Sequence, residues 1–208
     1  MQLRSDSFNS LQAIPDEFAF GVPTTGEMRH GGNRNPHLEW SGAPEGTRSF
    51  VVLCIDTDVP TEFDNANKPD QTLPRDMPRT DFTHWVMVDV PADVTEVAAG
   101  SCSDGVMEGG KQSPPGPAGS RQGRNDYGDE SAHWYGYDGP CPPFNDERLH
   151  HYHFHVCALD VEHIDVPADF GLDEVNKAME GHVLAKATLT GTYTRNTKSP
   201  QAAGMGPG

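Results

Sequence analysis

The 208-residue chain is short of hydrophobic residues, and this shortage limits the classes of protein it can belong to. Hydrophobic residues make up 35% of the chain, whereas glycine (22) and proline (18) are abundant, so short strands joined by turns are favoured over a helical bundle. No apolar run is long enough to span a bilayer, and residues 1–30 hold no apolar core of the signal-peptide kind. We therefore expect a cytoplasmic protein without membrane insertion.

Positive charge, and lysine in particular, is also scarce. Acidic residues outnumber lysine and arginine 31 to 15, which gives a formal charge of −16, and only five of the basic residues are lysines. Such a charge repels nucleic acids and anionic membranes, so neither is expected as a partner. A dispersed acidic, lysine-poor surface is typical of cytoplasmic proteins from salt-loving organisms, and it predicts weaker folding at low salt, where repulsion is poorly screened. The alternative is an ordinary acidic protein.

The four cysteines indicate neither a metal site nor disulfide bonds. Cys54 and Cys157 lie inside apolar runs and are expected in the core, whereas Cys102 and Cys141 lie in loop-like segments. Their spacings match no zinc ribbon, and a reducing compartment argues against disulfides. The sequence also has no Gly-x-Ser-x-Gly motif and no glycine-rich loop for phosphates or dinucleotides, so no cofactor is predicted.

Several apolar segments have the pattern of strands, and one segment has that of a helix. A continuous apolar run at 49–55 predicts a buried strand that stops at Asp56. The clearest alternation of faces covers 150–159. A helix is predicted at about 172–182, with Asp173 capping its start. Further strands are predicted at 183–193 and at 83–90, the latter with His84, Val86, Val88 and Val90 on one face.

Short strands separated by turn-rich loops, with one late helix, predict a mainly β protein. The expected fold is an antiparallel β-sandwich with long loops. We expect residues 1–195 to form a single domain, followed by a flexible Gly/Pro-rich tail at 196–208. The segment 100–148 shows little periodicity and is predicted to be loop.

Three polar-aromatic clusters lie where apolar runs begin or end. If the strand that ends at Asp56 runs antiparallel to strands that start at His84 and His150, these side chains meet at one rim of a sheet. The clusters are 56–60 (Asp-Thr-Asp-Val-Pro), His84-Trp85, and 139–143 (Gly-Pro-Cys-Pro-Pro) followed by His150-His151-Tyr152.

The order of these clusters resembles that of the phosphatidylethanolamine-binding protein family, which includes the Raf kinase inhibitor proteins, and most closely its bacterial and archaeal branch. Segment 56–60 is similar to the family's Asp-Pro-Asp-x-Pro signature, and 84–91 resembles its His-Trp strand closed by proline. Segment 139–143 resembles its Gly/Pro loop, and 150–152 its His-Arg-Tyr strand. Weaker likenesses at 32–40, 123–128 and 181–193 extend the resemblance over residues 15–195.

The resemblance implies a β-sandwich with a small pocket for anionic head groups, phosphate among them, and no catalytic machinery. We therefore expect a binding protein rather than an enzyme. Imidazole and phenol groups supply hydrogen-bond donors for a phosphate, and a carboxylate can orient a histidine. By position, the resemblance implies that Asp56, His84, His150 and Tyr152 contact the ligand, that Pro142 and the backbone around Cys141 form part of the wall, and that Asp58, Pro60 and Trp85 support the pocket.

Three departures from the family pattern bear on this pocket. Thr57 replaces a rigid proline, which leaves its loop less fixed. His151 replaces a permanent cation, which is expected to cost a supporting salt bridge. An insertion at 144–149, with Asp146 and Glu147, is expected to narrow or reshape the entrance.

Two alternative interpretations stay open for these residues. The protein could inhibit a kinase or protease, as some relatives do, through the outer loops 61–80 and 111–135. Asp56 and Asp58 could simply close a turn, and His84 could be a strand-end histidine with satisfied hydrogen bonds.

A metal-dependent enzyme of the cupin kind is a less favoured alternative. His151, His153 and His155 alternate on one strand face, but the outer two are expected about 13 Å apart, because a strand advances about 3.3 Å per residue. At most two of them could share an ion, so no metal is predicted. A homodimer that covers the strand edges is a further expectation that the sequence leaves open.

Overall fold

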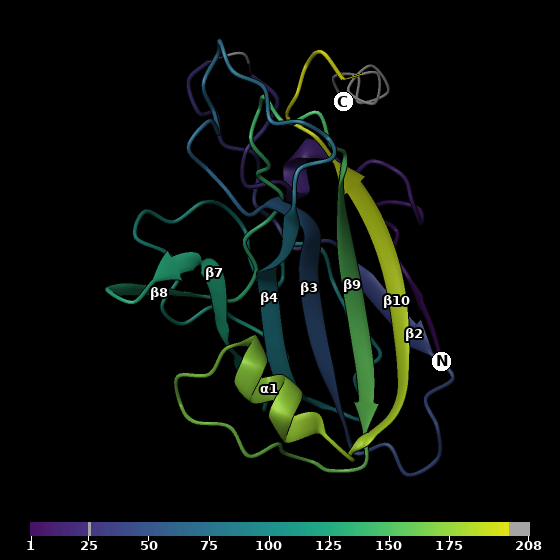
Figure 1. Ribbon diagram of the computed structural model, residues 1–208. Coiled ribbons are helices and arrows are strands. Elements are labelled where there is room, and N and C mark those ends of the chain that lie inside the picture. The colour runs from purple at the N-terminus through teal and green to yellow at the C-terminus, as the bar shows by residue number, and fades with distance from the viewer. Residues whose placement is uncertain (25, 200–208) are drawn as a thin grey trace.

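The computed structural model describes residues 1–24 and 26–199, which are built mainly from antiparallel strands (Figure 1). The largest sheet has five strands in the order β10-β9-β3-β4-β6. Because β3 pairs antiparallel with both β4 and β9, it is the central strand. The five strands are β3 (Ser49–Pro60), β4 (Arg79–Pro91), β6 (Arg121–Gln122), β9 (His150–Leu159) and β10 (Val183–Tyr193).

A smaller sheet packs against one face of the large one. Its strands, in the order β1-β2-β5, are β1 (Gln2–Arg4), β2 (Leu38–Ser41) and β5 (Glu96–Val97). Trp40 of β2 lies on Phe50 of β3, with 5.3 Å between ring centroids. Two facing sheets with a shared core form a β-sandwich, which confirms the predicted fold class. The core between the sheets also contains Leu38, Trp85, Met87, Phe154 and Val156.

The helix α1 (Leu172–Met179) covers the lower part of the other face of the large sheet (Figure 1). Val175 and Met179 pack on a second cluster of buried residues that includes Val86 and Leu159. The predicted helix is confirmed, but its predicted cap and end are wrong. Gly171 precedes the helix, and its backbone N–H donates to the Glu174 carboxylate (2.8 Å), so Asp173 is not the cap.

The predicted strands 150–159 and 183–193 are confirmed, whereas the first one is longer than predicted. The strand β3 does not stop at Asp56 but continues to Pro60, because Val59 and Pro60 still pair with β4. A register shift between Asp56 and Val59 accommodates this extension. The apolar pattern ends earlier than the strand, since polar side chains occupy the rim.

The predicted face alternation of β4 is wrong at both ends. A register shift beside His84 places its ring 5.1 Å from that of Tyr152, away from the face of Val86 and Val88. The alternation breaks again after Val88. Asp89 has a positive φ of 57°, and this left-handed residue shifts the phase of the strand. As a result, Val90 packs between the two sheets beside Met87, while Val86 and Val88 face the helix. The Asp89 side chain stabilises this backbone by accepting hydrogen bonds from Ile164 N–H (3.0 Å) and Arg121 Nε (2.7 Å).

The segment 100–148 is not all loop, contrary to prediction. It holds β6 and a two-stranded hairpin, β7 (Arg124–Asp129) with β8 (Ala132–Tyr135), that stands beside β4 (Figure 1). A short 3-10 turn, Asp16–Phe18, was also not predicted. All four cysteines are free, and Cys54, Cys102 and Cys157 are buried.

The end of the described chain is tied to the domain. Asn196 Nδ2 donates to the Asp146 carbonyl (2.8 Å), so the first residue of the predicted tail is hydrogen-bonded. Most of that predicted tail, 200–208, lies outside the described residues. Within the described part of the chain, no helix has the length and apolar character needed to cross a membrane.

Candidate functional site

One cavity of about 190 Å³ lies at the upper rim of the large sheet as drawn in Figure 1. Asp56 comes from β3, His84 from β4, and His150 and Tyr152 from β9. The antiparallel order brings them together, because Asp56 pairs with Tyr152 on one side and with Phe82 on the other. The remaining lining residues are Val59, Phe63, Phe82, Tyr127, Cys141, Pro142 and Pro143.

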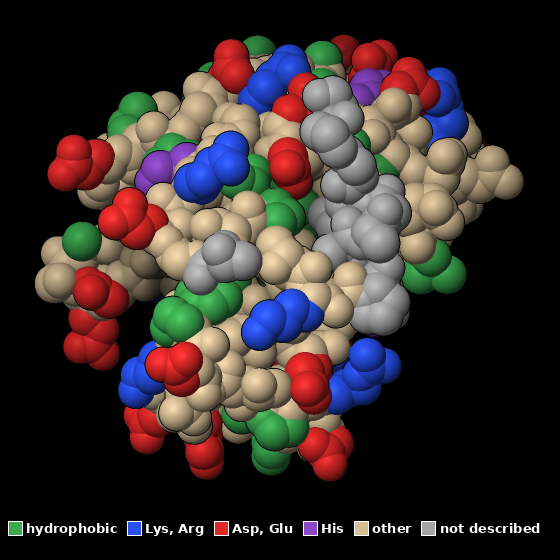
Figure 2. Space-filling view, turned by 90° about the horizontal axis from the view of Figure 1, so that it is seen from above, with side chains coloured by type: hydrophobic (Ala, Val, Ile, Leu, Met, Phe, Trp, Pro, Cys, Tyr) green, Lys and Arg blue, Asp and Glu red, His purple; other side chains and the backbone are tan. Residues whose placement is uncertain are grey.

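The structure thus places all six residues assigned to ligand contact, including Cys141 and Pro142, around one cavity. The three residues assigned to support do not line it. Trp85 is buried between the sheets, where its indole N–H donates to Gln122 Oε1 (2.9 Å). Pro60 ends β3 opposite Arg79, and Asp58 is bonded to groups outside the cavity. Viewed from above, acidic side chains are spread across the surface with basic ones between them (Figure 2).

Asp56 is buried and uses both carboxylate oxygens. Oδ1 accepts a hydrogen bond from the Asp58 backbone N–H (2.8 Å), which is the turn-closing contact considered from sequence. Oδ2 lies 2.6 Å from His150 Nδ1, so the same carboxylate also orients a histidine. Asp56 therefore both closes the turn and orients His150.

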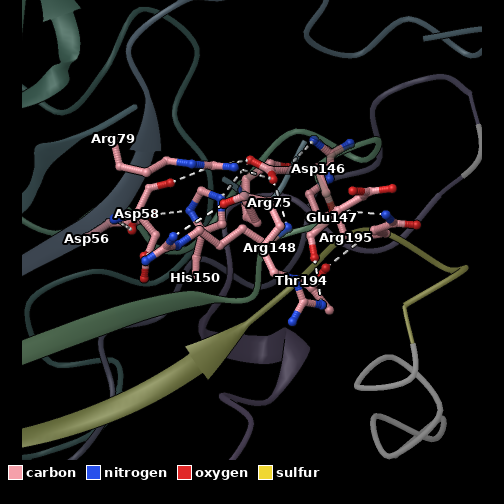
Figure 3. A network of polar contacts seen from close by, with 12 residues as sticks. Asp56, Asp58, Arg75, Arg79, Asp146, Glu147, Arg148, His150, Thr194 and Arg195 are labelled. Carbon is pink, nitrogen blue, oxygen red and sulfur yellow. Dashed lines mark hydrogen bonds and ion pairs between the residues drawn. The ribbon is translucent and has the colours of Figure 1, made fainter. Parts of the chain in front are cut away.

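His150 is enclosed between two carboxylates (Figure 3). Its Nε2 lies 3.2 Å from Asp146 Oδ2, opposite the contact with Asp56. Burial opposes the charged ring, but the two carboxylates prevail and raise the pKa of His150 to about 9. The ring is therefore an imidazolium at neutral pH, and both of its N–H groups are already bonded within the protein.

Asp146 also forms a two-point ion pair with Arg79, and both side chains are buried (Figure 3). The distances are 2.6 Å from Nη1 to Oδ2 and 3.0 Å from Nη2 to Oδ1. Burial disfavours the carboxylate, yet contacts with His150 and Arg79 lower the pKa of Asp146. Segment 144–149, which was predicted to be an insertion, therefore supplies a structural partner of His150.

Asp58 has three donors on its carboxylate. Arg148 Nε donates to Oδ1 (2.5 Å), and the backbone N–H and Nδ1 of His151 lie 2.9 Å and 2.7 Å from Oδ2. Burial disfavours the Asp58 carboxylate, but the contacts with His151 and Arg148 together lower its pKa. The expected loss of a salt bridge at His151 is thus wrong, because Arg148 from the insertion provides a permanent cation at this carboxylate.

We call these six groups the rim network, and their charges are balanced. Each of its three cations is within hydrogen-bond distance of at least one of its three carboxylates. No net positive charge is left in the network for an anion. The members are Asp56, Asp58, Asp146, Arg79, Arg148 and His150.

His84 has a different environment from His150. Its Nδ1 donates to the Asp138 carbonyl oxygen (2.7 Å), because a carbonyl can only accept. Burial lowers the pKa of His84, against the opposing effect of nearby carboxylates, of which Asp56 is the strongest. The ring is neutral, and its Nε2 keeps a lone pair without a partner among the described residues.

A buried group of polar side chains fixes the carbonyl that His84 uses. The Asp138 carboxylate accepts from Lys111 Nζ (2.5 Å), Asn33 Nδ2 (2.7 Å) and Asn125 Nδ2 (2.8 Å). Sequence reasoning missed these residues, since they come from loops with no periodicity. Asn33 and Asn125 do lie in two of the weaker family-like segments, which was the only available signal.

The Tyr152 hydroxyl is the most informative atom of the cavity. It is fully buried beside the Asp56 carboxylate, yet it makes no hydrogen bond of acceptable geometry with any described residue. Burial and, next, Asp56 raise the pKa of Tyr152 well above its usual value, so the phenol keeps its proton. Buried hydroxyls normally have partners, so this one is an exception among the described residues.

The rest of the wall is mostly apolar and was partly missed from the sequence. Tyr127 stacks on Phe20 at 4.8 Å and contacts Phe82 at 5.2 Å, while its hydroxyl donates to the Gly139 carbonyl (2.7 Å). Phe63 is 55% exposed at the cavity, on the loop between β3 and β4. No pattern in that loop singled it out.

The loop that carries Phe63 is held by one side chain of the insertion. Asn145 Nδ2 lies within hydrogen-bond distance of three backbone carbonyls of the loop, the closest being that of Asn65 (2.8 Å). In return, Asn145 Oδ1 accepts from the Asn67 N–H (2.8 Å). The insertion thus shapes one side of the cavity entrance.

The histidine row on β9 does not gather around a common point. His153 and His155 are parallel at 6.1 Å, and their Nδ1 atoms contact the hydroxyls of Thr190 (2.9 Å) and Thr188 (2.8 Å). Among residues 1–24 and 26–199, no group of three or more His, Cys, Asp or Glu side chains is arranged to hold a metal ion.

The chain is similar to known proteins in both sequence and fold. Residues 4–194 match the sequence profile described as "Phosphatidylethanolamine-binding protein". The chain is 32% identical to a UPF0098 protein of Methanothermobacter thermautotrophicus over 94% of this chain and 99% of the relative. It is 36% identical to the UPF0098 protein YbcL of Escherichia coli over 78% of this chain and 73% of the relative.

Solved structures show the same fold. The crystal structure of Escherichia coli YbcL, described as a new member of the mammalian PEBP family, superposes with a TM-score of 0.69 at 32% identity, covering 93% of this chain and 97% of that one. A putative phosphatidylethanolamine-binding protein homologue from Chlamydia trachomatis gives a TM-score of 0.63 at 26% identity, covering 92% and 95%.

Proposed function

Because the chain belongs to the phosphatidylethanolamine-binding protein family, we propose that it is a non-catalytic binding protein whose rim cavity takes the head group of a small phosphorylated or phosphate-like molecule. The unpartnered Tyr152 hydroxyl carries this proposal. A buried donor without a partner is costly unless a ligand completes it. The cavity, at about 190 Å³, is smaller than sites for drug-sized molecules, so a head group is a suitable occupant.

A binding role is supported by the lining residues that the structure describes, because none of them is an activated nucleophile. His150 has both nitrogens bonded to carboxylates, so it cannot act as a base. The described residues that line the cavity include no serine, threonine or lysine. Cys141 is paired with Arg195 (3.5 Å) rather than with a histidine, and burial raises the pKa of its thiol.

Isothermal titration calorimetry with phosphate and phosphoethanolamine in molar KCl tests the proposal. We expect wild-type protein to bind, and Tyr152→Phe to bind roughly tenfold or more weakly, because a hydrogen bond to a charged ligand is lost. Within residues 1–24 and 26–199 the Tyr152 hydroxyl makes no hydrogen bond of good geometry, so this variant should keep its fold. Tyr135→Phe is the matched control, since that hydroxyl bonds Asp169 (2.9 Å) outside the cavity. Equal binding by wild type and Tyr152→Phe would refute the site.

A second candidate function is inhibition of a kinase or protease, and the exposure of Phe63 on the loop at the cavity favours it. Here the partner surface would be the loop rather than the cavity. Inhibition that survives Tyr152→Phe but is lost in Phe63→Ser would support this candidate over the first.

We also propose a cytoplasmic location, which the four free cysteines favour.

A further inference from the structure

We propose that the thiol of Cys141 and the thioether of Met28 form a two-sulfur site for a soft monovalent metal ion, copper(I). We call these two side chains the sulfur pair. Cys141 also lines the rim cavity, but the site uses neither His84 nor Tyr152. The inference therefore goes beyond the proposed function and does not rest on it.

The two sulfur atoms lie at a distance that one metal ion can bridge. Cys141 Sγ is 4.0 Å from Met28 Sδ, although the two residues are 113 positions apart in the chain. Two metal–sulfur bonds of about 2.3 Å that meet at about 120° place their sulfur atoms about 4 Å apart. The separation of the sulfur pair therefore suits two bonds of one ion, without a movement of either segment.

A glycine at position 21 allows the two sulfur atoms to approach each other. A Cβ atom on Gly21 would lie 2.5 Å from Cys141 Sγ and 2.9 Å from Met28 Cε, so a side chain there would push the sulfur pair apart. The backbone fixes this arrangement, because the N–H groups of Phe20 and Gly21 both donate to the Pro140 carbonyl (2.9 and 3.1 Å). The segments that carry the two sulfurs are thus tied together beside the site.

The sulfur pair can be reached from solvent. Met28 is 44% exposed, and Cys141 is partly exposed, whereas the other three cysteines are buried. The Val22 N–H donates to the Arg29 carbonyl (2.9 Å), which anchors the backbone next to Met28. An ion therefore has an entry path to a site whose ligands are already in place.

The chemistry of the two donors selects copper(I) over harder ions. Thiolate and thioether sulfurs are soft ligands that favour Cu(I), whereas magnesium and calcium require oxygen ligands. Structural zinc is almost always bound by four ligands. Among residues 1–24 and 26–199, no group of three or more His, Cys, Asp or Glu side chains is arranged to complete such a shell.

Binding exchanges one proton for one copper ion. The S–H bond of Cys141 breaks, an S–Cu bond forms, and the proton passes to the buffer, while a lone pair of Met28 Sδ makes the second bond. Copper stays in the Cu(I) state, so the step needs no oxidant or reductant. Arg195 Nη1 donates to Cys141 Sγ (3.5 Å), and a cation at this distance favours the thiolate, which is the form that binds metal.

The test is a competition for copper(I) between the protein and the chelator bicinchoninate. It uses ascorbate to keep copper reduced and molar potassium acetate in place of KCl, because chloride itself binds copper(I). We expect one ion per wild-type chain and, by X-ray absorption, sulfur neighbours at about 2.3 Å. Cys141→Ser should abolish binding, and Met28→Leu should weaken it at least about tenfold, since loss of even an outer-shell partner has that effect. Met107→Leu is the matched control, because Met107 is similarly exposed (55%).

A glycine variant tests the geometry while both sulfurs are kept. Gly21→Ala should weaken copper binding, because the new methyl group occupies the space between the sulfur pair. Gly26→Ala is its control, since a Cβ atom there meets nothing within 4 Å and binding should stay as in wild type.

Three results would overturn the inference. They are absence of copper binding by wild-type protein, binding that survives Cys141→Ser, and binding by Met28→Leu as tight as that of wild type, which would mean that a lone thiol holds the ion. None of them bears on the proposed function, which is tested by titration of phosphate compounds into wild type and Tyr152→Phe. The copper affinity of Tyr152→Phe should equal that of wild type, so the two proposals can fail separately.

Discussion

His84 and His150 are both buried in the wall of one cavity, yet their surroundings give them opposite protonation states. Two carboxylates hold a proton on each nitrogen of His150, whereas a single carbonyl holds one proton on His84 and leaves a lone pair. Burial acts against the charged form in both. The difference shows that hydrogen-bond partners, and not exposure, set the protonation states of the two rings. His150 completes the rim network, and His84 presents a lone pair at the cavity.

The largest effect is expected from breaking the rim network at Asp146. Asp146→Ala leaves Arg79 and the Nε2 of His150 buried without their partner, so we expect a loss of about 3–5 kcal/mol in the free energy of unfolding. Urea denaturation in molar KCl measures it. Glu147→Ala is the matched control, because it removes an exposed neighbouring carboxylate and should change stability by less than about 0.5 kcal/mol. Similar losses in both variants would contradict a buried network.

The second prediction concerns the pH dependence of stability, to which His150 and His84 contribute in opposite directions. The raised pKa of His150 contributes stability that is complete below its unfolded value of about 6.5 and is lost as pH rises through about 9. The size of this contribution is on the order of 3 kcal/mol. The lowered pKa of His84 acts oppositely, since its contribution is complete above about 6.5 and is lost as pH falls below that value.

Ring NMR signals followed with pH check this assignment. One buried histidine should titrate near pH 9, and another should stay neutral to a lower pH than an ordinary histidine. Stability should decline from neutral to alkaline pH in wild type. Two buried rings that titrate together near about 6.5 would contradict the comparison.

The apolar patterns of the sequence predicted the strands that carry these rings, but not the partners that decide their charge. His150 and Tyr152 begin an unmistakable alternation, and Asp56 ends an apolar run. Asp146 and Arg79, in contrast, are 67 residues apart and lie in segments without periodicity. Their pairing depends on how two loops close over the rim, which no local pattern specifies.

An irregularity of the backbone likewise made the predicted face of Val90 wrong, because it depends on a contact between residues far apart in the sequence. A single left-handed residue, Asp89, moves Val90 to the opposite face of the sheet. Strict alternation could not anticipate it, because the signal is a hydrogen bond from Ile164, 75 residues away. The insertion at 144–149 was noticed as a departure, but its role as the source of Asn145, Asp146 and Arg148 became apparent only in three dimensions.

A smaller effect is expected at Arg148, which tests whether the network contains redundant contacts. Arg148→Ala removes one of three hydrogen bonds on Asp58, but both His151 contacts remain and the arginine is 40% exposed. We expect a loss of about 1 kcal/mol, well below that of Asp146→Ala. Arg75→Ala is the control, because the Arg75 guanidinium makes a weak contact of 3.4 Å to the Glu147 carbonyl. A loss as large as that of Asp146→Ala would show that Arg148, rather than Arg79, is the essential cation.

The smallest effect is expected for the salt dependence of the contribution that the rim network makes to stability. The salt dependence of the whole protein should be larger, because it comes from the acidic surface. The formal charge of −16 predicts that wild-type protein loses stability when KCl is lowered from molar to low concentration, because exposed acidic groups repel one another over a longer range. The part of the rim network around Asp146, formed with Arg79 and His150, is buried, so salt should screen it little. The stability difference between wild type and Asp146→Ala should therefore change by less than about 0.5 kcal/mol across the same range. If that difference shrank strongly in high salt, the network would have to be solvent-accessible, and the contrast between a compensated rim and a repulsive surface would fail.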